Sequence, residues 1–200
     1  MNIKKTANLF ANFTIKRIAE ILGITVLSAG VLLLLALLTY SPEDPNFIFP
    51  ENTKIKNILG FHGSIVSDLF FQSIGLISYL FSFTLIVTGI NIIRSKEFFL
   101  IIENIFFAII YCIFGTLFFA HFYSEAFTLY INGNGGFIGA YLNQSFLNSI
   151  ILINEVIFYY LLIILNIFLF LISINFHPIK FYEFIKSLNR IFTKKERQSH

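Results

Sequence analysis

The sequence is poor in charged residues, cysteine and tryptophan. Asp, Glu, Lys and Arg make up only 12% of its 200 residues, about half of the share that is usual in globular proteins, whereas hydrophobic residues make up 56%. A soluble fold of this size has too little interior to bury so many apolar side chains. The composition therefore excludes an ordinary soluble domain and indicates an integral membrane protein.

The single cysteine, Cys112, excludes an internal disulfide framework and a cluster of thiolate metal ligands. Tryptophan is absent although the chain has 27 phenylalanines, a bias that we ascribe to the source genome rather than to aromatic chemistry. Zinc-protease motifs, paired redox cysteines and phosphate-binding loops are missing from the sequence as well. We therefore expect no catalysis, no cofactor and no metal site within this chain.

Four apolar segments are long enough to cross a membrane. They cover residues 21–40, 69–93, 98–120 and 150–173. The first of them would extend about 30 Å as a helix, which matches the hydrocarbon core of a bilayer. The predicted fold class is thus an all-α integral membrane domain with four transmembrane helices over residues 21–175, between a basic segment, 1–20, and a tail, 176–200.

Positive charge is distributed unevenly around these spans. Twelve of the fourteen Lys and Arg residues lie before the first span, between the second and third spans, or after the fourth. The two loops on the other side of the membrane hold only Lys54 and Lys56. The positive-inside rule then predicts that both termini are cytoplasmic.

The tail has the pattern of a basic amphipathic helix. Apolar side chains recur at helical spacing from Phe181 to Phe192, with Lys and Arg between and after them. Such a helix is expected to lie on anionic lipid headgroups at the membrane surface. A nucleic-acid-binding surface is the weaker alternative, because a run of basic residues has little specificity by itself.

Three polar residues in or near the spans are candidates for function: Glu103, Asn104 and Glu155. A carboxylate within a membrane is costly and commonly functional. Glu103 is shallow enough to reach the interface or to pair with Arg94 or Lys96, which favours a structural role. The two acids are predicted near opposite faces of the membrane, so they do not form a catalytic pair.

Small residues suggest where helices pack. Gly75, Ser78 and Ser82 share one face of the second span, and the first span has Gly23, Ser28, Ala29 and Gly30. Four glycines also cluster between residues 133 and 139. No Lys or Arg lies between Lys96 and Lys180, so phosphate binding is disfavoured, and the glycine cluster is predicted to be a flexible outer turn.

The first span ends in an acidic turn, Ser41-Pro42-Glu43-Asp44-Pro45. Prolines remove backbone donors, and paired carboxylates are costly to desolvate, so no membrane helix continues through it. We expect Pro42 and Pro45 to stiffen the turn and the two acids to keep it in water.

Residues 38–47, LTYSPEDPNF, resemble the end of the first span in FtsK/SpoIIIE-type DNA translocases, which typically read TYSPxDPxF/W after a leucine-rich run. The resemblance extends over about residues 18–175, the four-span amino-terminal domain of that family, and is weakest in the glycine stretch. The residues that carry it are Tyr40, Ser41, Pro42, Asp44, Pro45, Gly60, Gly63, Asp68, Gly75, Tyr79, Gly135, Gly136 and Gly139.

This resemblance implies a bacterial inner-membrane protein at the division septum. In that family the membrane domain anchors and helps to oligomerise, as a hexamer, a cytoplasmic ATP-driven motor that pumps chromosomal DNA, and it contacts other division proteins. The present sequence has no phosphate-binding loop, so ATP and DNA would be handled only by a motor domain absent from it. Whether the chain is part of a longer product or a separate anchor is left open. The alternative prediction is a small transporter or channel subunit that uses Glu103 and Glu155.

Overall fold

The computed structural model describes residues 3–45, 54–124, 132–178 and 186. All regular elements in these ranges are helices. Four stretches are long and apolar enough to cross a membrane: Asn12–Leu38, Gly60–Ser95, Leu100–Phe122 and Glu155–Ser173. The predicted all-α, four-span fold class is confirmed. Most of the predicted amphipathic tail lies outside the described residues.

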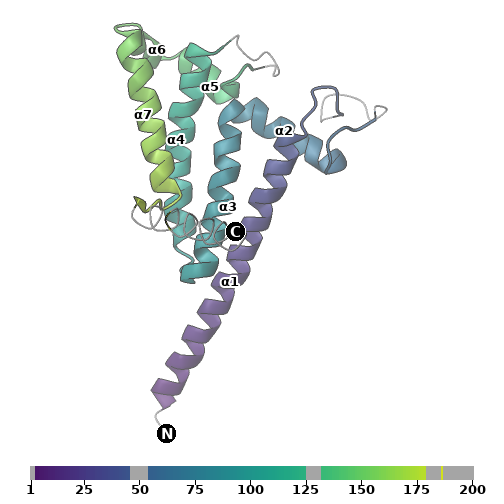
Figure 1. Ribbon diagram of the computed structural model, residues 1–200, viewed down its shortest axis with the longest axis vertical. Coiled ribbons are helices and arrows are strands. Elements are labelled where there is room, and N and C mark those ends of the chain that lie inside the picture. The colour runs from purple at the N-terminus through teal and green to yellow at the C-terminus, as the bar shows by residue number, and fades with distance from the viewer. Residues whose placement is uncertain (1–2, 46–53, 125–131, 179–185, 187–200) are drawn as a thin grey trace, which may run out of the picture.

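The described residues form four long helices and three shorter ones. The long helices make a bundle, and the shorter ones gather at one end of it (Figure 1). The elements are α1 (Ile3–Leu38), α2 (Gly60–Ile74), a 3-10 turn η1 (Gly75–Ile77), α3 (Ser78–Ser95), α4 (Leu100–Phe122), α5 (Gly136–Asn143), α6 (Phe146–Ile151) and α7 (Glu155–Ser173). We call the end with α2, α5 and α6 the cap end. The opposite end, where α1 begins and α7 ends, is the terminal end.

The first helix is much longer than the predicted span. Its 36 residues extend about 54 Å, and its N-terminal part projects beyond the bundle at the terminal end (Figure 1). No proline interrupts residues 3–38, so the helix continues through the expected boundary at residue 20. Glu20 pairs there with Arg17 at 2.5 Å and with Lys96 at 2.6 Å, which joins α1 to the end of α3.

The second apolar segment is broken where the sequence predicts one continuous span. Gly75 has φ +61° and ψ −143°, a backbone conformation that ends α2. The chain then turns into α3, and α2 extends across the cap end (Figure 1). The helix that runs through the bundle is therefore Ser78–Ser95, and residues 69–74 of the predicted span belong to α2.

The last span also begins later than predicted. Residues 150 and 151 close the short helix α6, and α7 starts at Glu155. The Asn154 side chain caps α7 by accepting a hydrogen bond from the Ile157 amide at 3.2 Å. The start of the span is therefore set by a local cap.

Glycines hold α1 close to α3. Gly23 lies against Gly89 and Ile93, and Gly30 lies against Ile86, with too little space for a methyl group at either position. Such small residues let two membrane helices approach closely. Ser28 and Ala29 are exposed, so only the two glycines among the four predicted small residues belong to this contact.

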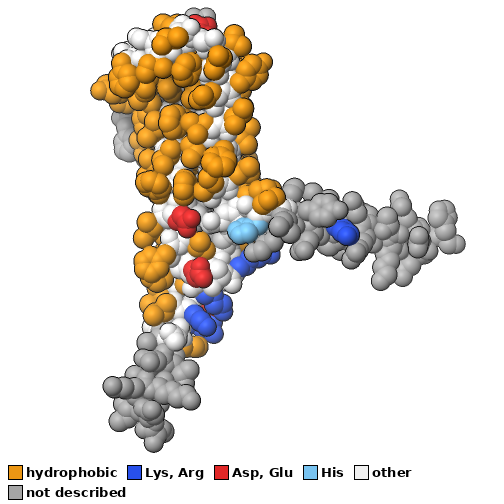
Figure 2. Space-filling view, turned by 90° about the vertical axis from the view of Figure 1, so that its left-hand side faces the viewer, with side chains coloured by type: hydrophobic (Ala, Val, Ile, Leu, Met, Phe, Trp, Pro, Cys, Tyr) orange, Lys and Arg blue, Asp and Glu red, His pale blue; other side chains and the backbone are white. Residues whose placement is uncertain are grey.

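The surface has the layering expected of a membrane protein. On the face shown in Figure 2, hydrophobic side chains cover most of the upper part of the bundle, and acidic and basic side chains gather toward the terminal end. Large apolar side chains such as Ile164 and Phe168 are more than half exposed. In water this surface would aggregate, whereas in a bilayer it contacts lipid.

Candidate functional site: the cap end of the bundle

The acidic turn after α1 is fastened to the chain that leads into α2. Asp44 is only 2% exposed. One carboxylate oxygen accepts a hydrogen bond from the Lys56 amide and the other from the Asn57 amide, both at 2.8 Å. The prediction that Asp44 keeps the turn in water is therefore wrong, because these two backbone donors replace water around the carboxylate.

Asn57 continues this connection into α1. Its buried side chain donates to the Ala36 carbonyl at 2.9 Å and accepts from the Leu59 amide at 3.1 Å. A methyl group at Gly63 would overlap the Asn57 side chain, so glycine is needed there for a steric reason.

The other side of the turn is fixed by Ser64 of α2, whose hydroxyl donates to the carbonyl of buried Pro45 at 2.9 Å. We call Asp44, Pro45, Asn57 and Ser64 the exit clasp. Its hydrogen bonds join the end of α1 to the start of α2 through groups that are far apart in the sequence.

Pro42 and Glu43 form the exposed part of the turn. The Glu43 carboxylate pairs with the Lys56 ammonium at 2.5 Å. The hydrogen bond from Lys56, and then its charge, lower the pKa of Glu43, and the same contact raises the pKa of Lys56. Both side chains are well exposed, so solvent screens the pair and its contribution to stability is small.

Two tyrosines close the cap end against α1. The Tyr40 hydroxyl donates to an Asp68 carboxylate oxygen at 3.1 Å, and the Tyr79 hydroxyl donates to the Leu37 carbonyl at 3.3 Å. The buried ring of Phe71 lies between them, with ring centroids 4.9 Å from Tyr40 and 5.5 Å from Tyr79. Tyr40, Asp68 and Tyr79, which carry the sequence resemblance, are thus brought together by the fold.

The glycine stretch before α5 packs against the break between α2 and α3. The Asn134 carbonyl accepts from the Leu76 amide at 2.9 Å. A methyl group at Gly75 would overlap that carbonyl, and one at Gly136 (φ +64°) would lie 2.7 Å from the backbone nitrogen of Gly75. We call Gly75, Asn134, Gly135, Gly136 and Gly139 the glycine junction.

The glycine junction also reaches α4. Methyl groups at Gly135 or Gly139 would overlap the carbonyl of Thr116. All five residues of the junction are buried. The prediction of a flexible outer turn is therefore wrong for Gly135, Gly136 and Gly139, because their backbone packs closely against α4 and the α2–α3 break.

The intramembrane polar candidates differ in burial. Asn104 is fully buried; its amide donates to the Thr88 hydroxyl at 2.8 Å, and its carbonyl oxygen accepts from the Asn175 side chain at 2.7 Å. It thereby connects α4 to α3 and to the residues just after α7. Glu103 and Glu155 are exposed in the first turns of α4 and α7.

These first turns lie at opposite ends of the bundle (Figure 1). Lys96 pairs with Glu20, and the described residues contain no ion pair to Glu103. The fold brings the two acids neither together nor into its interior, and no group of metal-ligating side chains occurs in the described ranges. Nothing in this geometry favours a transport path through Glu103 and Glu155.

Among the buried polar residues that sequence reasoning missed are Asn57, Ser64 and Asn134. Each contacts backbone groups distant in the sequence, and the Asn134 amide donates to the Tyr123 carbonyl. Asn and Ser are common in loops and at helix starts for local reasons, so their positions in the sequence carry no clear signal of these contacts.

The four long helices and the cap fastened to them define a multi-pass helical membrane domain. A family described as "4TM region of DNA translocase FtsK/SpoIIIE" matches residues 15–186. The chain belongs to this family, and it is the membrane domain of an FtsK-type translocase in the bacterial inner membrane.

Three relatives illustrate the similarity, each described as DNA translocase FtsK. The protein of Rhizobium meliloti is 29% identical over 87 residues, 44% of this chain and 10% of that protein. The protein of Brucella melitensis is 35% identical over 69 residues, 34% of this chain and 8% of the relative. The protein of Caulobacter vibrioides is 35% identical over 79 residues, which are 40% of this chain and 10% of that protein. The matches thus span a tenth or less of each relative, and no solved structure matches the chain significantly.

Proposed function

We propose that this chain anchors an FtsK-type DNA translocase at the division septum and holds its copies together as a hexamer. The family match over residues 15–186, which includes all four spans and the cap, is the observation that carries this proposal. In this assignment the chain is not itself an enzyme. ATP and DNA are handled by a motor domain outside it, and its own partners are lipid, further copies and other division proteins.

We assign the contact with division proteins to an aromatic pair on α5. Phe137 and Tyr141 are 63% and 68% exposed, and their rings stack with centroids 6.5 Å apart. They stand one helical turn apart on the short helix that the glycine junction holds against α4. An exposed aromatic pair on a rigid base suits protein recognition, because little conformational entropy is lost on binding.

A fluorescent fusion of the chain should form a band at midcell in dividing cells. The double variant Phe137→Ser/Tyr141→Ser should lose this band but remain in the membrane fraction at normal abundance, because both side chains are exposed. The matched control is Pro42→Ala/Glu43→Gln, which alters exposed residues of the exit turn and should keep the band. Uniform membrane staining of the unmodified fusion would refute septal targeting, and a persistent band in the double variant would refute the assigned contact.

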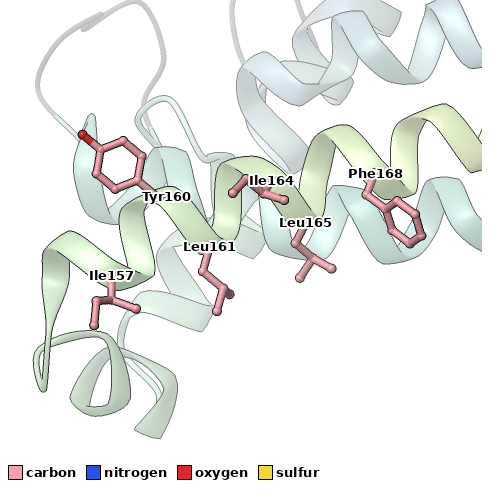
Figure 3. Close-up of a pocket in the computed structure, with 6 residues that line it drawn as sticks. All are labelled: Ile157, Tyr160, Leu161, Ile164, Leu165 and Phe168. Atoms are coloured by element: carbon pink, nitrogen blue, oxygen red, sulfur yellow. The ribbon is translucent and has the colours of Figure 1, made fainter.

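We assign the contact between copies to α7. Only 17% of the apolar stretch of α7 is buried within the protein, whereas 33% to 39% of the corresponding stretch is buried in each of the other three spans. A shallow groove of about 680 Å³ runs along α7. Figure 3 shows the six side chains of α7 that line it: Ile157, Tyr160, Leu161, Ile164, Leu165 and Phe168. A helix packed on one side only has the most surface to offer a neighbouring copy in the membrane.

Cysteine crosslinking tests this contact in membranes. Ile164→Cys should crosslink copies to one another, whereas Ile24→Cys, on a comparably exposed side of α1, should not. The native Cys112 is buried and should give no product. Equal crosslinking from Ile164→Cys and Ile24→Cys, or none from either, would contradict an α7 contact without bearing on septal targeting.

A further inference from the structure

An apolar groove lies on the membrane-facing side of α1, below α2. Its volume is about 460 Å³. Ala29 and Ala36 of α1 form one wall, Gly63 and Val66 of α2 form another, and Leu85 of α3 also lines it. The small, exposed side chain of Ala29 leaves room between the helices on this side of α1. Because this wall of α1 belongs to a stretch with a mean hydropathy of 2.7, the groove opens toward hydrocarbon.

The shape of the groove disfavours a helix of another protein. A straight transmembrane helix running beside α1 would meet α2, which crosses the cap end (Figure 1). A flexible hydrocarbon chain that enters from the cap end can instead bend beneath α2 and lie against Ala29 and Leu32. The occupant that fits is therefore thin, flexible and apolar along this part of its length.

The α2 side of the groove also has a polar residue. His62, in the first turn of α2, lines the groove and is exposed. Lys54 is exposed in the segment that leads into α2, whereas the charge of Lys56 is paired with the Glu43 carboxylate. A group that accepts hydrogen bonds and carries negative charge is complementary to this region.

We propose that the groove binds a phospholipid from the leaflet at the cap end, with one acyl chain between α1, α2 and α3 and the phosphate at His62. The acyl chain contacts Ala29, Leu32 and Val66, which line the groove and are exposed, and the His62 ring donates a hydrogen bond to a phosphate oxygen. The lipid then fills the space beneath α2 and supports α2 in its position across the bundle. This inference does not depend on septal targeting or on the number of copies.

Photolabelling tests the site with the purified chain in phosphatidylglycerol vesicles that contain a phosphatidylglycerol with a diazirine on its acyl chain. We expect adducts to concentrate on residues 29–36 and 62–70 above the level on the exposed side of α4 that carries Ile102, Phe106 and Ile109. Ala29→Phe fills the groove and should remove this excess. Ser28→Phe, at the neighbouring exposed position that does not line the groove, should retain it. His62→Ala should lower the excess without moving the labelled residues.

Uniform labelling of all four spans, or an undiminished excess in Ala29→Phe, would overturn the proposal. Crosslinks between two copies at residues 29–36 would also overturn it, since another chain would then occupy the groove. Thermal unfolding of Ala29→Phe and Ser28→Phe side by side identifies any loss of fold, and Val66→Phe fills the same groove from α2 if Ala29→Phe is unstable. Septal localisation is not a readout here, so failure of this test leaves the proposed function standing.

Discussion

Replacement of Asp44 by alanine should lower the free energy of unfolding by about 3 kcal/mol, because it leaves one buried and one partly buried backbone donor without an acceptor. The Asp44 carboxylate accepts from the amides of Lys56 and Asn57, each at 2.8 Å. Without it, the segment before α2 loses its hydrogen bonds to the turn after α1, and only contacts such as that of Asn57 with the Ala36 carbonyl remain. The exit clasp should then open, although the transmembrane helices themselves remain.

The measurement is the unfolding free energy in detergent micelles, followed by circular dichroism. Glu43→Ala is the matched control, because Glu43 is the neighbouring acid in the same turn but is exposed and paired only with Lys56; its unfolding should be unchanged within error. Asp44→Asn keeps one acceptor oxygen, so its free energy of unfolding should lie between those of Asp44→Ala and Glu43→Ala. Equal effects of Asp44→Ala and Glu43→Ala would show that the buried hydrogen bonds do not hold the cap.

The second large effect is expected at the break between α2 and α3. Gly75→Ala places a side chain on a residue with a sparsely populated backbone conformation, and this strain costs about 1–3 kcal/mol of stability. It also forces overlap with the Asn134 carbonyl, and overpacking of this kind costs about 1–3 kcal/mol. We expect a total loss of about 4 kcal/mol, which is a large part of the stability of an ordinary domain.

Gly60→Ala separates the effect of backbone strain from the effect of steric overlap. Gly60 has a similar φ of +65°, but a methyl group there meets nothing within 4 Å. It should therefore show backbone strain without overlap and cost roughly 1 kcal/mol. The same unfolding measurement serves for both variants. If Gly75→Ala costs no more than Gly60→Ala, the glycine junction yields to the extra methyl group and does not hold α5 rigidly.

The four spans were predictable because a bilayer imposes a local requirement. A crossing segment must satisfy its own backbone hydrogen bonds and be apolar over a fixed length, so each span can be recognised from its own residues. The break at Gly75 was not predictable in this way. Glycine within an apolar segment is ordinarily tolerated, and this one ends a helix where the Asn134 carbonyl, from a distant segment, occupies the space that a side chain would need.

The polar residues show the same division. Glu103 and Asn104 are adjacent in the sequence, yet Glu103 is exposed and Asn104 is fully buried. Successive residues point in directions about 100° apart around a helix, so the rotation of α4 in the bundle decides between them. That rotation depends on the packing of α4 against α3 and α7, and the sequence pattern of α4 alone does not predict it.

The sequence by itself determined that this chain is a four-span membrane protein, and the residues around the acidic turn were enough to indicate its family. Only the tertiary structure decided that Asp44 is a buried acceptor, that Gly75 ends a helix, and that the glycine stretch is packed. The physical reason is the range of the interactions. Hydropathy and helix length are properties of one segment, whereas the partners of Asp44 and Gly75 come from segments that meet only after the chain has folded.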